Sequence, residues 1–177
     1  MNPNFKEPAR VYVGRLTSSP IGPMWLALSR QGLAMVEWEM PQADFIRLVE
    51  QRLNATAILS EEHTREAIRQ LDNYLEGHRQ EFSIPVDFSG MTPFQTQVLQ
   101  LTAQIPYGCT STYKELADHS GHPNAARAVG RVEATNPIPI VIPCHRVLGT
   151  DGALHGYGGP GGVKLKSWLL QLEQANK

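Results

Sequence analysis

The chain has 177 residues, of which 41% are hydrophobic and 19% charged. This balance is typical of a globular protein with one large domain or two small ones, and no apolar run reaches the length of a membrane helix. The net charge of −1 excludes a strongly basic nucleic-acid binder, although residues 91–177 carry seven basic against five acidic side chains.

The first eight residues are polar and contain two prolines, without the basic start and apolar core of a signal peptide. We therefore expect a cytoplasmic protein with no membrane contact. The two cysteines, Cys109 and Cys144, form no disulfide framework, and no cysteine–histidine cluster suggests zinc. We expect neither a metal nor a cofactor.

Residues 1–90 predict a small α/β domain. Alternating apolar residues between positions 10 and 40, interrupted by turn clusters, favour an antiparallel meander with Trp25 and Trp38 in its core. Helical spacing follows over 43–53 and 61–76. The expectation is a small antiparallel sheet with helices that supports the rest of the chain and contributes no chemistry.

Residues 91–177 predict a mainly α-helical domain. Thr92 and Pro93 are an N-cap and a first helical residue. Two short helices, over 112–120 and 124–134 with Asn124 as N-cap, flank a turn at 121–123 and resemble a helix-turn-helix. A last helix spans 163–175 and carries Glu173 near its end, where a carboxylate opposes the helix dipole.

The second of these short helices is unusually bare. Ala125, Ala126, Ala128 and Gly130 are small, while Arg127 and Arg131, four residues apart, share a face and can reach phosphates or a base stack. Close packing against a neighbouring helix would require the same small residues, so periodicity leaves both interpretations open.

The segment from Asn136 to Val147 holds the strongest chemical signal. Three prolines interleaved with β-branched residues exclude a helix and favour a rigid extended strand. The strand presents Cys144, followed at once by His145 and Arg146. A thiol beside a proton acceptor can become a nucleophilic thiolate, whereas an ordinary core cysteine would be followed by apolar residues.

A glycine-rich loop, 156–162, follows this segment. It lacks the Lys-Ser/Thr ending of a phosphate-binding loop, which argues against a nucleotide site. We interpret the loop as a flexible lip beside the Cys144 pocket.

Asn136-Pro137-Ile138-Pro139-Ile140 and Pro143-Cys144-His145-Arg146-Val147 resemble the active-site signature of the O6-alkylguanine-DNA alkyltransferases, or methylated-DNA–protein-cysteine S-methyltransferases. The resemblance is dense from Met91 to Glu173. It implies direct-reversal DNA repair, in which an alkyl group moves irreversibly and stoichiometrically from O6-alkylguanine to the cysteine after base flipping. O4-alkylthymine stays open as a second substrate. The implied partner is duplex DNA carrying alkylated guanine, bound by a monomer.

Carried over residue by residue, the resemblance assigns the chemistry as follows. Cys144 receives the alkyl group, His145 acts as its base through a water, and Glu173 orients His145. Tyr113 donates a proton to the departing guanine, and Asn136 is a hinge. The implied DNA contacts are Arg127, which fills the vacated stack, and Ala126, Arg131 and Tyr113; the implied substrate pocket is formed by Pro139, Val147, Tyr157 and Gly158.

Two features depart from the family pattern. Glu133 lies three residues before the hinge, where relatives are often apolar or neutral, and a carboxylate close to DNA would weaken binding unless it points away. The loop 158–162 is about two residues longer and contains Pro160, which affects the shape of the pocket.

Two other function classes compete with alkyl transfer. A sensor would bind alkylated DNA without transfer, but such relatives lack the cysteine that is present here. A Cys-His-Glu hydrolase would need an oxyanion hole and normally places its nucleophile at a helix N-terminus, which a proline-rich strand before Cys144 does not provide.

Overall fold

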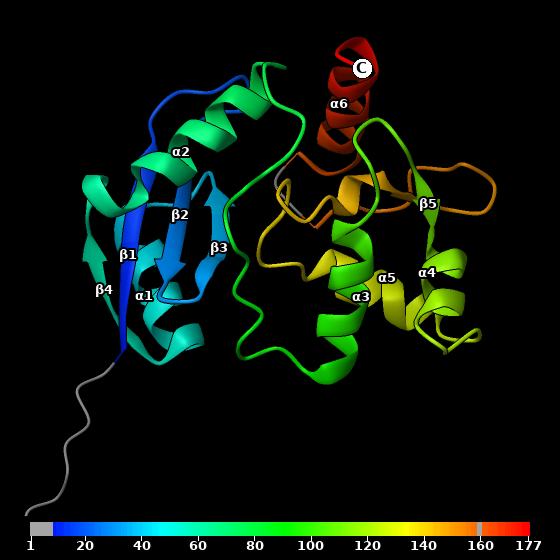
Figure 1. Ribbon diagram of the computed structural model, residues 1–177, viewed down its shortest axis with the longest axis horizontal. Helices are drawn as coiled ribbons and strands as arrows, with labels where there is room; N and C mark the ends of the chain where they lie inside the picture. Colours follow the sequence, from blue (N-terminus) through cyan, green and yellow to red (C-terminus); the bar gives the residue numbers. More distant parts are fainter. Residues whose placement is uncertain (1–8, 159–160) are drawn as a thin grey trace, which may run out of the picture.

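The computed structural model describes residues 9–158 and 161–177. The N-terminal residues 1–8, on which the signal-peptide argument depends, and Gly159 and Pro160 of the glycine-rich loop lie outside it. Figure 1 places the sheet of the N-terminal half beside the helices of the C-terminal half.

The N-terminal sheet has four strands: β1 (Ala9–Leu16), β2 (Met24–Ser29), β3 (Gly32–Trp38) and β4 (Ala55–Leu59). Their spatial order is β3-β2-β1-β4. The first three strands form the expected antiparallel meander, but β4 pairs parallel to β1. The prediction of a purely antiparallel sheet was therefore wrong, because the five-residue β4 follows α1 directly and was not recognised as a strand.

Helices cover both faces of this sheet. Helix α1 (Gln42–Leu53) packs Phe45 and Val49 against one face, and α2 (Glu61–Leu75) packs against the other, in front of the strands in Figure 1. Alternate strand residues point to opposite faces. Trp25 accordingly contacts the α1 side and Trp38 the α2 side, and both are core residues as expected.

The chain between the two halves covers the exposed edge of β3. Leu33 N–H donates to Pro85 O at 2.8 Å, and Asp87 N–H donates to Leu33 O at 2.9 Å. Farther along the same edge, Val36 N–H donates to Pro137 O at 2.9 Å. An open strand edge is thereby paired, and β3 is tied to the segment that leads to Cys144.

Within residues 91–158 and 161–177, the C-terminal half contains four α-helices, a short 3₁₀ helix and two short paired strands. Thr92 and Thr112 each form a capping box with the third residue of their helix, as their sequences favour. Asn124 is not an N-cap; that position belongs to Ala125, whose side chain makes no capping bond. The elements are α3 (Pro93–Ala103), β5 (Ser111–Thr112), α4 (Tyr113–His119), α5 (Ala126–Ala134), η1 (Cys144–Arg146), β6 (Val147–Leu148) and α6 (Gly162–Ala175).

One apolar core runs through both halves. It joins Leu26 and Leu71 of the sheet side to Leu99, Ile138 and Leu169 of the helical side. The division into domains 1–90 and 91–177 stays a prediction, because this core is shared. Among the described residues no helix is long and apolar enough to cross a membrane.

Candidate active site

The segment before Cys144 is a compact turn and not the extended strand that its prolines suggested. Ile142 N–H donates to Ile138 O at 2.9 Å, and Ile140 has a φ of 75°, which is strained for a β-branched residue. Cys144 then opens the 3₁₀ helix η1. The prolines exclude an α-helix, but they are compatible with a tight turn as well as with a strand. Packing of the buried Ile138, Ile140 and Ile142 side chains stabilises the turn.

His145 and Glu173 form the centre of a fully buried polar network. His145 Nε2 lies 2.6 Å from Glu173 Oε1, and both side chains have no solvent exposure. Nε2–H therefore donates to the carboxylate, and the ring has the tautomer whose Nδ1 is a free acceptor. Nδ1 is buried and has no partner among the described residues. The pairing expected from the resemblance is thus present in the geometry.

Arg146 and the backbone complete the surroundings of Glu173. Arg146 Nε donates to Oε1 at 3.0 Å and to Oε2 at 3.1 Å, and Gly108 N–H donates to Oε2 at 2.9 Å. Burial opposes the ionisation of Glu173, but the hydrogen bonds from His145 and Arg146 outweigh it and hold its pKa at about 2. Burial lowers the pKa of His145, so the imidazole is neutral and can accept a proton.

The N-terminal half contributes Tyr74 to this network, which sequence reasoning missed. The Tyr74 hydroxyl, on α2, donates to Glu173 Oε1 at 2.5 Å and lies 3.2 Å from His145 Nε2. The expectation that residues 1–90 contribute nothing to the chemistry is therefore wrong, because a side chain of this half contacts both His145 and Glu173. Tyr74 lies on the apolar face of α2, where its sequence context is that of an ordinary core aromatic.

Cys144 lies on a small pocket of about 30 Å³, and only 4% of its surface is exposed. Asn136, Pro139, Tyr157 and Gly158 line the same pocket. Burial raises the pKa of the thiol to about 12, against the lowering effect of the Asn136 side chain. The resting cysteine is a protonated thiol, so the easily formed thiolate that the sequence suggested requires a base.

A second cavity of about 480 Å³ adjoins this pocket and opens to the surface. Ala126, Arg127, Gly130 and Ala134 of α5 form one wall, and residues 155–158 form another. Ala134, Tyr157 and Gly158 line both spaces. A Cβ at Gly158 would lie 2.0 Å from Ala134 O, so only glycine fits this contact.

Tyr113 lies in the larger cavity beside a lysine that the sequence analysis did not single out. Lys166 Nζ donates to Val147 O at 2.6 Å, His155 O at 3.1 Å and Tyr113 Oη at 3.3 Å. Burial raises the pKa of Tyr113 to about 12. A lysine beside Leu165 on the inward face of α6 was the available signal, because lysine is seldom buried without partners.

The structure separates the predicted site residues into those that meet and those that do not. Asn136 joins α5 to the cysteine segment: its Nδ2 donates to Ile142 O at 2.9 Å and its Oδ1 accepts from Ile138 N–H at 3.0 Å. Val147 does not line the Cys144 pocket, because its side chain is in the core. Arg131 is exposed but does not line the 480 Å³ cavity.

Glu133 is not where the sequence suggested. It is 4% exposed, lines the Cys144 pocket and has Oε1 2.6 Å from Thr102 Oγ1. The expectation of a carboxylate beside the DNA phosphates is therefore wrong, since α5 turns this position inward.

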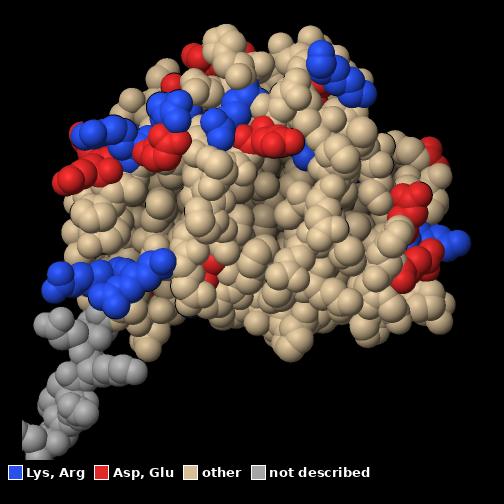
Figure 2. Space-filling model, in the orientation of Figure 1, with Lys and Arg blue, Asp and Glu red and all other residues tan. Residues whose placement is uncertain are grey.

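On the face seen in Figure 2, charge does not mark a DNA-binding surface. Figure 2 shows Lys and Arg next to Asp and Glu along the upper edge of this view, around a wide uncharged middle.

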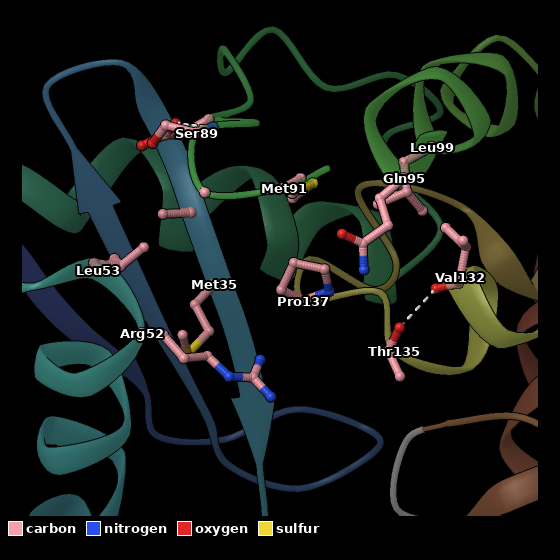
Figure 3. A pocket seen from close by; sticks show the side chains of 13 residues that line it. Met35, Arg52, Leu53, Ser89, Met91, Gln95, Leu99, Val132, Thr135 and Pro137 are labelled. Atoms are coloured by element: carbon pink, nitrogen blue, oxygen red, sulfur yellow. Dashed lines mark hydrogen bonds between the residues drawn. The ribbon is translucent and has the colours of Figure 1, made fainter. Parts of the chain in front are cut away.

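A further cavity of about 310 Å³ lies between the halves, where Met35 and Arg52 approach Gln95 and Pro137 (Figure 3). It has no cysteine or histidine in its lining. No group of three metal-ligating side chains occurs within residues 9–158 and 161–177.

Comparisons with known proteins agree with this geometry. Residues 93–175 match the DNA-binding domain of 6-O-methylguanine DNA methyltransferase, and residues 12–88 match its ribonuclease-like domain. The methylated-DNA–protein-cysteine methyltransferase of Methanosarcina barkeri is 41% identical over 162 residues, covering 91% of this chain and 96% of its own length. That of Mycobacterium leprae is 42% identical over 163 residues, covering 90% and 91%.

The fold is also found among solved structures. Mycobacterium tuberculosis OGT in complex with DNA is similar, with a TM-score of 0.76 and 37% identity over 93% of this chain and 94% of that one. The resemblance first read from residues 136–147 is thus confirmed over nearly the whole length. The chain belongs to the O6-alkylguanine-DNA alkyltransferases, the family of methylated-DNA–protein-cysteine methyltransferases.

Proposed function

We propose that Cys144 is the acceptor of the alkyl group, and that its donor is O6-alkylguanine in duplex DNA. As a member of its family the protein is a methyltransferase that repairs DNA by alkyl transfer to a cysteine. The observation that carries the assignment is the buried Cys144 thiol, next in sequence to a histidine whose Nε2–H is bound to Glu173.

Proton removal from Cys144 is the first task. His145 Nδ1 is the free acceptor of the network, and the Glu173 carboxylate stabilises the imidazolium that forms when Nδ1 takes a proton. A water can relay the proton from the sulfur to Nδ1. Arg146 and Tyr74 hold the carboxylate and so fix the orientation of the ring.

Alkyl transfer then follows as an in-line displacement. The thiolate sulfur attacks the alkyl carbon, the new C–S bond forms, and the bond between that carbon and guanine O6 breaks. The bonding electron pair stays on the guanine. A proton from the Tyr113 hydroxyl neutralises it, and the neighbouring Lys166 ammonium stabilises the phenolate. The proton held by His145 then leaves to solvent and a solvent proton restores the Tyr113 hydroxyl, so the net change is transfer of the alkyl group to sulfur and of one proton from the thiol to guanine.

Base flipping brings the guanine to the sulfur. The 480 Å³ cavity is large enough for a base and adjoins the Cys144 pocket across Ala134, Tyr157 and Gly158. Arg127 lies at its wall on α5, where its side chain can fill the vacated stack. Ala126 allows close approach of α5 to the duplex, and Arg131 can contact phosphates. We place this activity in the cytoplasm and assign it to a monomer without a cofactor.

A stoichiometric titration tests the proposal. Methylated duplex is added in increasing molar ratio, and methyl groups lost from DNA and gained by protein are counted. We expect both counts to stop at one per protein. Binding without methyl loss would favour the sensor, and continued turnover would exclude a permanent thioether on Cys144; hydrolysis of an ester or peptide substrate would favour the hydrolase.

A further inference from the structure

Glu133 has an unused hydrogen-bond acceptor beside the nucleophile. Its Oε2 is buried and has no partner among the described residues, while its Oε1 is 2.6 Å from Thr102 Oγ1. A buried polar atom without a partner costs free energy, so such an atom in an active-site pocket points to a group that arrives with the substrate.

Above its pKa of about 7 Glu133 is ionised, and Oε2 is then a carboxylate oxygen that only accepts hydrogen bonds. The Thr102 hydroxyl has one proton and lies within bonding distance of Val98 O, at 2.9 Å, as well as of Glu133 Oε1. In neutral Glu133, Oε2 accepts when that proton goes to Val98 O and Oε1 holds the acid proton, but Oε2 donates when Thr102 donates to Oε1. The ionised form therefore offers an acceptor in every arrangement.

The charged and titratable neighbours do not satisfy Oε2. The buried Lys166, on α6, lowers the pKa of Glu133 through its positive charge. Its three N–H groups, however, are directed to Val147 O, His155 O and Tyr113 Oη. Glu37 of β3 lines the same pocket and also lacks a proton to give when ionised. Tyr113, Cys144 and Tyr157 are the remaining titratable groups that face this space or influence it.

The position of Oε2 determines which part of a substrate meets it. Because Cys144 and Glu133 line the same pocket of about 30 Å³, the atoms attached to the attacked carbon enter the space between them. The guanine itself requires the neighbouring 480 Å³ cavity. A group on the second carbon of the alkyl chain is therefore the part of the substrate nearest Glu133.

We propose that Glu133 is a specificity-determining residue that favours O6-alkyl groups bearing a hydrogen-bond donor on the second carbon, such as 2-hydroxyethyl. This inference rests on the proposed function of Cys144 and deepens it. The hydroxyl donates to Glu133 Oε2, and the Tyr157 hydroxyl, which is buried in the same pocket beside Cys144, can donate to it in return. An apolar group of the same length displaces water and leaves Glu133 Oε2 unpaired.

The test compares two substrates of nearly equal size. Duplexes with O6-(2-hydroxyethyl)guanine and O6-(2-fluoroethyl)guanine differ at one atom, and fluorine has no proton to donate. Single-turnover transfer to the wild-type protein is expected to be about tenfold faster for the hydroxyethyl group. In Glu133→Met the ratio should fall to about one, and in Glu133→Gln, which keeps an amide oxygen, it should lie between these values.

Using a ratio within each protein cancels any general loss of activity in a variant. Equal rates for the two substrates in the wild type would overturn the inference, and so would an unchanged ratio in Glu133→Met. If Glu133→Met fails to fold, the wild-type comparison still decides. Methylguanine duplex is the reference: absence of methyl transfer would contradict the proposed function, whereas methyl transfer with a ratio of one contradicts only the role of Glu133.

Discussion

Tyr74 on α2 and Glu173 on α6 share a buried hydrogen bond of 2.5 Å, although they lie 99 residues apart in the chain. The bond joins the N-terminal half to the carboxylate that orients His145. The N-terminal half is therefore part of the active site's support at the level of single atoms, and not only through shared apolar packing.

Tyr74→Phe removes the hydroxyl and keeps the ring. The carboxylate loses one of its donors, so we expect the pKa of Glu173 to rise and His145 to be held less firmly. Transfer from free O6-benzylguanine should slow by about tenfold, the cost of one hydrogen bond to a charged group. The matched control is Tyr12→Phe, because Tyr12 stacks on His63 and lines neither the Cys144 pocket nor the 480 Å³ cavity. An acid limb of the pH–rate profile that is unmoved relative to Tyr12→Phe would contradict the role of Tyr74.

Arg127→Ala should affect only substrates that must be flipped. We expect a large loss of activity on alkylated duplex and little loss on free O6-benzylguanine, because the free base needs no partner in the stack. Arg131→Ala is the control: Arg131 is exposed on the same helix but does not line the cavity, so only salt-dependent duplex binding should weaken. Equal losses of Arg127→Ala on both substrates would assign Arg127 to the fold or the pocket.

Glu133 predicts an unusual dependence of stability on pH. Its pKa in the folded protein is about 7, compared with 4.5 ordinarily, chiefly because it is buried. Between these pH values the unfolded chain has released the proton and the folded protein still binds it, so the free energy of unfolding falls as pH rises. The loss approaches about 3 kcal/mol by pH 7.

The comparison of wild type with Glu133→Gln isolates this contribution. His145, whose pKa is lowered, acts in the opposite direction, because its unfolded form binds the extra proton. That effect is common to both proteins. Urea unfolding from pH 4.5 to pH 8 should show the stability of Glu133→Gln relative to wild type increasing with pH and then levelling off. A constant difference would mean that Glu133 ionises normally.

The alkylated protein should be less stable than the unreacted one. Cys144 is 4% exposed on a pocket of about 30 Å³, so a thioether adds atoms to a tight space and removes a proton donor. Overpacking costs about 1–3 kcal/mol. We expect the melting temperature to fall after methylation and to fall further after benzylation. An equal or higher melting temperature after reaction would show that the pocket accepts its product without strain.

Local rules predicted most of the helices. The Thr92-Pro93 start depends on residues close in sequence, and capping chemistry acts at that range. Strand β4 was not predicted, because it pairs with β1 in parallel after helix α1 packs on the sheet. Local periodicity does not encode such long-range pairing. The turn at Ile140 was not predicted for a similar reason, since tertiary packing stabilises the positive φ of Ile140.

The site residues also divide into those that local sequence predicts and those that depend on tertiary contacts. The sequence identified Cys144 and His145 because they are adjacent, and the resemblance supplied Glu173. Tyr74 and Lys166 act through contacts across the fold: nothing in the local sequence distinguishes Tyr74 from a core aromatic, and the only local signal for Lys166 is its position beside Leu165 on the inward face of α6. Glu133 was assigned to the wrong environment because helix α5 was known only by composition, and its inward face was set by packing against Thr102.

The most direct test of the central claim is the position of the transferred group. Wild-type protein, Cys144→Ser and Cys109→Ser are incubated with methylated duplex, and peptides are mapped by mass. We predict one methyl group on Cys144 in the wild type and in Cys109→Ser, whose changed residue is exposed. Cys144→Ser should bind the duplex without gaining a methyl group. A methyl group on Cys109, or a labelled Cys144→Ser, would contradict the account.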